Sequence, residues 1–184
     1  MISLHCQSMC RSRRKRLDRY AVPYWARCFL MSHSYLSRIV WTGNRGCGTS
    51  GYRDYDRSWD IAVPGKPVIH CSNDPLLGGD TTRMNPEDLL LSALAACHML
   101  WYLHYASESG IVVTSYEDQT VGIAEVAAGG AGQFVSATLH PRITVHAQAD
   151  LAVAEAIHHR IHEVCLIARS VKFPVYCAPE FISG

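Results

Sequence analysis

The sequence lacks several features that are typical of secreted proteins or of proteins stabilised by a structural metal ion. None of its eight cysteines forms a CxxC pair, which argues against a thioredoxin motif and a zinc ribbon. No apolar stretch of about 7–15 residues follows the basic cluster at residues 11–16, so a secretory signal is not expected. A chain of 184 residues can build a core without disulfide staples. We therefore expect a cytoplasmic protein, in which a functional cysteine is catalytic, redox-sensing or metal-binding.

Charge is scarce and unevenly distributed. Charged residues make up 18% of the chain, and the net charge is +1. Residues 1–30 carry seven Lys/Arg and one acid, a balance of +6, whereas residues 31–184 carry ten Lys/Arg and fifteen acids, a balance of −5. A mildly acidic body does not fit nucleic-acid binding. We expect residues 1–30 to be disordered or to precede a true start at Met31, and residues 31–184 to form one domain.

The clearest helix signal begins at Asn85, a favourable N-cap, followed by Pro86 and two acidic residues. The helix is expected to continue to about Ser107. Residues 89–106 have no charge, and apolar residues cover every face, which is typical of a helix buried in a core or a membrane. Its length is at the lower limit for a membrane span, and strand-like segments flank it, so we expect a buried helix and no membrane partner.

The other segments complete an α+β domain. A second helix is expected over residues 150–170 from the spacing of its apolar residues. Strand patterns occupy residues 36–63 (two strands around a glycine-rich turn at 43–48), 67–71, 111–128, 133–147 and 171–177. Glycines at 129–132 predict an antiparallel hairpin between residues 111–128 and 133–147. Strands and helices in this order indicate the α+β class.

Two cysteines on the predicted helices are candidates for chemistry, although buried cysteine more often serves as a small apolar residue. Cys97 lies in the apolar helix, and Cys165 follows His162 by one helical turn, where an imidazolium would favour the thiolate. His158, His162 and Cys165 would share one helical face and could bind zinc. Surface histidines on an amphipathic helix are the alternative interpretation, and we expect no metal and no bound cofactor.

Residues 85–98 (NPEDLLLSALAACH) resemble the segment that carries the reactive cysteine in the OsmC/Ohr family. Residues 162–170 (HEVCLIARS) resemble the second cysteine segment of that family, with Leu166 where many members have proline. The resemblance extends over residues 35–181. It implies the OsmC-like fold, in which antiparallel sheets wrap around buried helices in an intertwined homodimer with active sites at the interface. The uncharged faces of residues 89–106 fit such a dimer, because one small sheet cannot cover all of them.

The resemblance also implies a function, the reduction of organic hydroperoxides by a thiol peroxidase. Cys97 would attack the peroxide and become a sulfenic acid, and Cys165 would condense with it to a disulfide that protects Cys97 from over-oxidation. An external dithiol would reduce the disulfide. Two alternatives remain open at this point. One is a binding module for an apolar ligand, and the other is a metal-binding redox sensor.

In the family, an arginine paired with the glutamate that matches Glu87 activates the reactive thiol. Glu87 and Cys97 are ten residues apart, a rise of roughly 15 Å on a helix, so an arginine or the partner subunit must bridge them. Many OsmC-like members have an arginine in the loop before this segment, where the chain reads LGGD at residues 77–80, so that arginine is missing here. Arg45, in the sequence TGNR, resembles the arginine of the Ohr branch and is our predicted activating residue, with Arg53 and Arg83 as alternatives.

Overall fold

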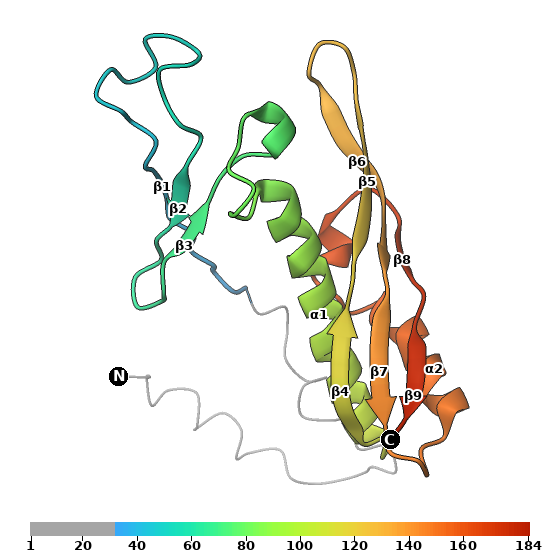
Figure 1. Cartoon of the computed structure of the whole chain (residues 1–184). Helices are drawn as coiled ribbons and strands as arrows, with labels where there is room; N and C mark the ends of the chain where they lie inside the picture. The colour runs from blue at the N-terminus through green and yellow to red at the C-terminus, as the bar shows by residue number, and fades with distance from the viewer. Residues whose placement is uncertain (1–31) are drawn as a thin grey trace, which may run out of the picture. The chain divides into compact units, whose positions relative to one another are not determined.

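Three small sheets and two α-helices build residues 37–184, which form one compact unit (Figure 1). The protein is described by a computed structural model that covers residues 32–184. The expectations for residues 1–30 and for a start at Met31 lie outside the described residues. In chain order the elements are β1 (Ile39–Trp41), β2 (Trp59–Ile61), β3 (Ile69–Cys71), η3 (Pro75–Leu77), α1 (Pro86–Glu108), β4 (Val113–Asp118), β5 (Val121–Val126), β6 (Gly132–Leu139), β7 (Pro141–Val145), α2 (Leu151–Ile161), η4 (Ala168–Ser170), β8 (Val175–Cys177) and β9 (Glu180–Ser183).

The first sheet is the predicted antiparallel hairpin with a third strand added, in the order β1-β2-β3. Its strands are shorter than the sequence pattern suggested, because residues 43–58 form a loop held by its own polar groups. Asn44 Oδ1 accepts hydrogen bonds from the backbone N–H groups of Gly46 (2.8 Å) and Gly48 (3.0 Å). Trp41 Nε1 donates to the Asp56 carbonyl at 2.9 Å. These side-chain bonds compete with strand pairing.

The predicted long hairpin is present but splits into two sheets, in the orders β4-β7-β9 and β5-β6-β8. β4 pairs with β7, and β5 pairs with β6, both antiparallel. Asp118 marks the division, because its Oδ1 accepts from Thr120 Oγ1 and from the backbone N–H of His140, both at 3.0 Å. β8 and β9 then add in parallel to β6 and β7. β9 was not predicted from the sequence.

Helix α1 begins and ends where the sequence predicted. Asn85 Oδ1 accepts from the Asp88 N–H at 2.7 Å, and Asp88 Oδ2 accepts from the Asn85 N–H at 3.1 Å, a reciprocal capping box. Together with Pro86 in the first turn, this cap fixes the start of the helix and therefore the position of every residue along it.

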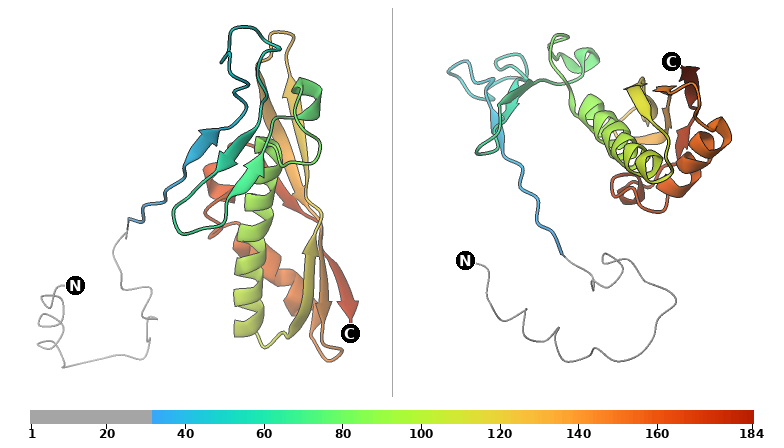
Figure 2. Two further views of the ribbon diagram at one scale, coloured as in Figure 1. Left: turned by 60° about the vertical axis from the view of Figure 1, so that its left-hand side comes forward. Right: turned by 90° about the horizontal axis from the view of Figure 1, so that it is seen from below.

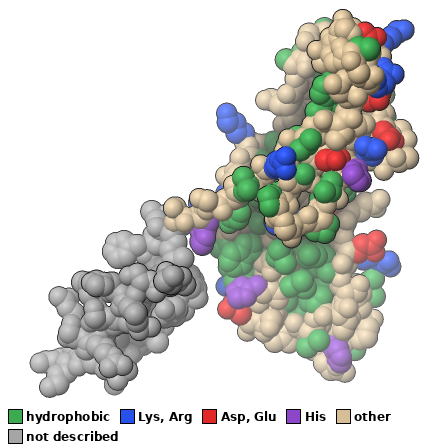
Figure 3. All heavy atoms as spheres, turned by 90° about the vertical axis from the view of Figure 1, so that its left-hand side faces the viewer, with side chains coloured by type: hydrophobic (Ala, Val, Ile, Leu, Met, Phe, Trp, Pro, Cys, Tyr) green, Lys and Arg blue, Asp and Glu red, His purple; other side chains and the backbone are tan. Residues whose placement is uncertain are grey.

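The expected burial of α1 holds for one face only. Leu94, His98, Tyr102 and Ala106 are buried at a spacing of four residues. On the opposite side Leu100 is 63% exposed, and hydrophobic side chains gather on this face of the molecule (Figure 3). The physical reason is that the sheets and α2 of this chain cover only one side of the helix. By length and composition alone, α1 is also long and apolar enough to span a membrane, but its buried face packs as part of a protein core.

Helices α1 and α2 lie on the same side of the sheet β4-β7-β9 (Figure 2). The main core forms between them, around Tyr102, Ile143, Ile157 and Ile161. A second cluster joins Leu94 of α1 to Ala137 and Leu139 of β6, and the segment after η4 packs against it. The α+β class is confirmed.

The prediction of a second helix through residue 170 was wrong in its extent, because α2 ends at Ile161. Beyond it, the N–H groups of Glu163 and Val164 bond to the carbonyls three residues earlier, at 3.3 and 3.0 Å. This tightening ends the regular helix. Cys165 therefore lies in a turn rather than on a helix.

Candidate functional site

Cys97 and Cys165, 68 residues apart in the chain, lie together between α1 and the turn after α2. Cys165 Sγ is 2.9 Å from Cys97 Sγ and donates a hydrogen bond to it. Cys165 is buried, whereas Cys97 is half-buried. A disulfide bond is about 2.05 Å long, so the two sulfurs need to approach by only about 0.9 Å to form one.

The turn after α2 directs the Cys165 side chain inward. The backbone N–H of Cys165 donates to the Ile161 carbonyl at 2.9 Å, and the Ala168 N–H points at Cys165 Sγ at 3.5 Å. Burial, followed by the hydrogen bond to Cys97, raises the pKa of Cys165 to about 11. Cys165 is therefore a protonated thiol near neutral pH, ready to act as a donor.

The exposed side of Cys97 faces an apolar cavity of about 340 Å³ lined by Cys97, Leu100, Trp101 and His104. Cys97 is three residues before Leu100 and four before Trp101, and His104 is three residues after Trp101, so the four side chains occupy one face of α1. Trp101 contacts the His104 ring edge-on, with the ring centroids 5.6 Å apart. This shallow, open cavity presents apolar side chains beside the exposed side of the Cys97 sulfur.

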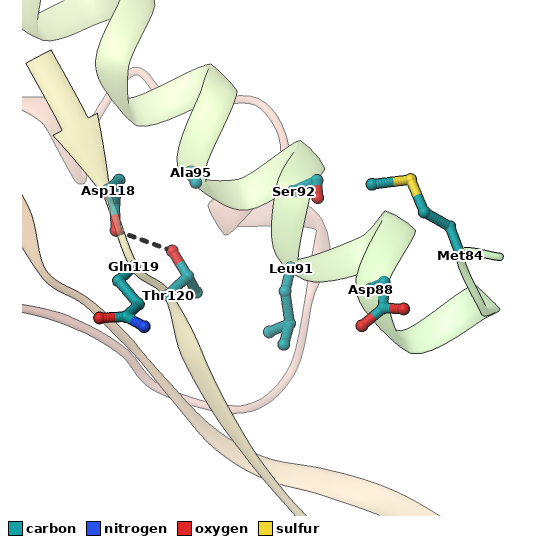
Figure 4. A pocket seen from close by; sticks show the side chains of 8 residues that line it. All are labelled: Met84, Asp88, Leu91, Ser92, Ala95, Asp118, Gln119 and Thr120. Carbon is teal, nitrogen blue, oxygen red and sulfur yellow. Dashed lines mark hydrogen bonds between the residues drawn. The ribbon is translucent and has the colours of Figure 1, made fainter. Parts of the chain in front are cut away.

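A second cavity, of about 330 Å³, lies on another face of α1 (Figure 4). Asp88, Ser92 and Ala95 line it from the helix, and Asp118 and Thr120 line it from the strand side. Successive helix residues are rotated by about 100°, so a side chain two positions after Ala95, such as that of Cys97, points roughly the opposite way. This cavity does not belong to the cysteine pair.

In this single chain, the predicted activating residues Arg45 and Glu87 make no hydrogen bond or ion pair with the two cysteines. Glu87 is exposed in the first turn of α1. Arg45 bonds within its own loop, to the carbonyls of Arg53 and Asp54, and its Nε is 3.8 Å from Asp56 Oδ1. Within residues 32–184 of this single chain, no ion pair connects Glu87 with an arginine. Activation of Cys97 by Arg45 and Glu87 stays a prediction.

The two alternative arginines are similarly occupied elsewhere or exposed. Arg83 pairs with Asp80, with Nε 3.3 Å from Oδ2. Arg53 is exposed. Neither makes a hydrogen bond or ion pair with Cys97 in the part of the chain that the structure describes.

A second cluster of reactive side chains was not predicted as a group. His98 Nε2 lies 2.8 Å from His158 Nδ1, and Cys177 Sγ lies 3.7 and 3.4 Å from these two nitrogens. Both histidines are buried, and Cys177 is partly buried. The alternative zinc set of His158, His162 and Cys165 does not assemble within residues 32–184, because the end of α2 at Ile161 breaks the shared face and His158 turns toward His98 instead.

Burial controls the protonation of this second cluster. It lowers the pKa of His98 to about 4 and that of His158 to about 3, with repulsion from nearby histidines adding to both shifts. Burial and then the charge of Asp118 raise the pKa of Cys177 to about 12. Two neutral imidazoles and a thiol therefore meet in the core. His158 Nε2 is buried and has no hydrogen-bond partner among residues 32–184.

Part of this cluster could have been found from the sequence. His98 occupies the same four-residue stripe as Leu94 and Tyr102, and His158 follows Ala154 by four residues, so each helix places one histidine on its buried face. A buried histidine needs a polar partner. Nothing in the local sequence identifies that partner as Cys177.

The fold and the paired thiols define a class of small α+β protein in which two cysteines meet between α1 and the turn after α2. Comparison with known families makes the assignment specific. The family described as OsmC-like protein matches residues 78–178, more than half of the chain. The chain belongs to this family, as its two cysteine segments predicted.

Solved structures show the same fold. The chain is similar to an OsmC-like protein of unknown function, VCA0330 from Vibrio cholerae, with 25% identity and a TM-score of 0.72 over 80% of this chain and 99% of that one. It is also similar to an organic hydroperoxide resistance protein from Elizabethkingia anophelis, with 15% identity and a TM-score of 0.59 over 84% of this chain and 100% of that one. OhrB of Bacillus subtilis matches with 18% identity and a TM-score of 0.50, over 80% of this chain and 98% of that one. A comparison with curated proteins found no match.

Proposed function

We propose that this protein is a thiol peroxidase that reduces organic hydroperoxides through Cys97 and Cys165. The observation that carries the proposal is the 2.9 Å separation of the two sulfurs. Family membership adds support, since the fold is shared with proteins named for organic hydroperoxide resistance.

The two thiols have different roles because their environments differ. Cys97 borders the cavity and accepts a hydrogen bond from Cys165, so its sulfur is the one of the pair that an incoming peroxide can reach. Cys97 is therefore the nucleophile. Cys165 is buried and its pKa is raised, so it keeps its proton until Cys97 has reacted.

The reaction proceeds in three balanced steps. The Cys97 thiolate attacks the outer peroxide oxygen, breaks the O–O bond, and leaves a sulfenic acid and an alkoxide, which takes a proton to become the alcohol. The Cys165 thiol then condenses with the sulfenic acid, forming the Cys97–Cys165 disulfide and releasing water. An external dithiol reduces this disulfide to two thiols and is itself oxidised to a disulfide.

The apolar cavity beside Cys97 selects the substrate. Leu100 and Trp101 are suited to an aryl or alkyl group and offer little to the small, polar hydrogen peroxide molecule. An organic hydroperoxide with a bulky apolar group is therefore the expected substrate class.

The functional unit proposed is a homodimer in the reducing cytoplasm. The exposed apolar face of α1, which includes Leu100 and Leu103, supports the dimer, because a partner subunit packed there would remove these side chains from water. A partner subunit packed on this face would also bring a second set of Arg45 and Glu87 side chains to the assembly. Within that dimer an arginine from either subunit would supply the positive charge that stabilises the Cys97 thiolate.

Mass spectrometry of the intact protein tests the mechanism. After one equivalent of cumene hydroperoxide, the wild type should contain the Cys97–Cys165 disulfide. Cys97→Ser should abolish both the disulfide and peroxide consumption, and Cys165→Ser should leave a sulfenic or over-oxidised Cys97. Cys47→Ser, which removes an exposed thiol, is the control and should behave as wild type. Peroxide consumption that survives Cys97→Ser would exclude the mechanism.

A further inference from the structure

Three elements far apart in the chain bring metal-binding atoms to one point in the core. His98 Nε2 from α1, His158 Nδ1 from α2 and Cys177 Sγ from the end of β8 all lie within 4.8 Å of one another. Within residues 32–184 this is the one group of three or more such side chains that converges so closely. It is separate from the proposed peroxidase pair, because none of its three ligands is Cys97 or Cys165.

Two of the three distances match those of a tetrahedral zinc site. Zinc lies about 2.0–2.1 Å from histidine nitrogen and about 2.3 Å from cysteine sulfur, which places two ligand nitrogens about 3.3 Å apart and a nitrogen and a sulfur about 3.6 Å apart. The two nitrogen–sulfur distances, 3.7 and 3.4 Å, already agree with these values. The nitrogen–nitrogen distance of 2.8 Å needs to open by about half an ångström.

The surroundings also favour a metal. Imidazole nitrogen and cysteine sulfur are ligand types that bind zinc in proteins, and both histidines are buried beside Cys177. The three polar groups lie in an otherwise apolar core, where zinc coordination would replace the weak nitrogen–sulfur contacts of 3.7 and 3.4 Å with metal–ligand bonds.

A route to solvent and a free coordination position are present as well. A cavity of about 270 Å³ borders His158 and Cys177, and the exposed residues Glu155 and His162 line its mouth. An ion can enter from this side, and a water molecule in the cavity can occupy the fourth position. A site with three protein ligands and one water has the composition of an open zinc site.

We propose that His98, His158 and Cys177 form a zinc site whose fourth ligand is a water molecule in this cavity. On binding, the Cys177 thiol loses its proton and its sulfur bonds to the ion, so one proton is released for each zinc bound. The ion ties α1, α2 and β8 together next to Cys97. It thereby stabilises the fold and the position of the redox pair without taking part in peroxide reduction.

Cobalt titration tests the site in the untagged full-length protein. The wild type should bind one equivalent of Co²⁺ with the visible spectrum of tetrahedral cobalt and a thiolate-to-cobalt charge-transfer band, and zinc should displace it. Cys177→Ser should remove the charge-transfer band. Cys165→Ser and Cys97→Ser should keep it, which separates this site from the redox pair and makes the result independent of peroxidase activity. Cys71→Ser, another buried thiol, is the matched control.

Two outcomes would overturn the proposal. The first is a wild type that gives no thiolate band, and the second is a band that survives Cys177→Ser. Because a variant of a partly buried residue can lose its fold, circular dichroism of each variant accompanies the titration. A measurement on the wild type provides an independent check, since bound zinc should slow alkylation of Cys177 at least tenfold. An alkylation rate that zinc leaves unchanged would equally refute the site.

Discussion

Replacement of Tyr102 should loosen the contact between α1 and α2 and thereby impair disulfide formation. The side chain is fully buried, its ring stacks on that of His158 with centroids 4.5 Å apart, and its hydroxyl donates to the Ala154 carbonyl at 3.3 Å. It therefore connects α1, which carries Cys97, with α2, which leads into the turn that holds Cys165.

The magnitude follows from these contacts. Tyr102→Ala removes a ring of the kind that buries about 150–250 Å² and leaves a cavity, and such changes cost about 3–5 kcal/mol of unfolding free energy. Tyr102→Phe keeps the ring and loses one long neutral hydrogen bond, which costs about 0.5–1 kcal/mol. Tyr105→Ala is the matched control. Tyr105 is only half-buried and lies against the Arg160 guanidinium, 4.1 Å from the ring centre, so its loss should cost about half as much.

Urea unfolding at pH 7.5 measures these differences, and the oxidised protein provides a second measurement. After one equivalent of cumene hydroperoxide, folded Tyr102→Ala should contain less disulfide and more over-oxidised Cys97 than either Tyr102→Phe or Tyr105→Ala. Equal stabilities for the two alanine variants, or a cost below about 1 kcal/mol for Tyr102→Ala, would show that Tyr102 does not connect the helices as described.

Three further predictions concern the start of α1, its contact with β5 and the buried thiol. Asn85→Ala should lower the free energy of unfolding by about 1 kcal/mol in urea denaturation, since it removes the cap, and an unchanged value would contradict the capping role. Gly122→Ala should cost about 1–3 kcal/mol, because a Cβ there would be 2.8 Å from Leu91 Cδ2 of α1 and 2.6 Å from Phe134 Cε1, whereas Gly129→Ala, with nothing within 4 Å, should be close to neutral in the same assay. Cys165 should be alkylated slowly at pH 8 and faster as the pH rises toward its pKa of about 11; rapid alkylation at pH 8 in the folded, reduced protein would argue against a buried, protonated thiol.

Local signals in the sequence were sufficient to predict α1. Asn85, Pro86 and Asp88 act on the first turn of the same helix, so their effect does not depend on the rest of the fold. The hairpin around residues 129–132 was predictable for the same reason, since its turn and its two strands are adjacent in the chain. The cysteine segments were identified by their resemblance to a family rather than by any physical signal in the two thiols.

The elements that the sequence did not reveal depend on contacts between distant segments. A strand was predicted over residues 171–177, where β8 lies, but β9 was not predicted, and the parallel pairing of these two strands with β6 and β7 has no turn to mark it. The end of α2 at Ile161 was missed because residues 162–170 keep a helical apolar pattern while their backbone tightens to bury Cys165. Tertiary contact, here with Cys97, outweighs helix propensity.

For His98 and His158, the sequence predicts burial but not the partners that each side chain contacts. Helix periodicity assigns His98 and His158 to the buried stripes of their helices, so each residue alone can be identified as a polar group in need of a partner. Only the topology makes them partners of each other, because α1 and α2 must first lie on the same side of one sheet. Cys177 joins them only because β8 adds in parallel to the outer edge of β6, which sets the register that pairs Leu139 with Cys177. A shift of that register by one residue would turn the thiol to the opposite face of the sheet, and the three ligands would no longer converge.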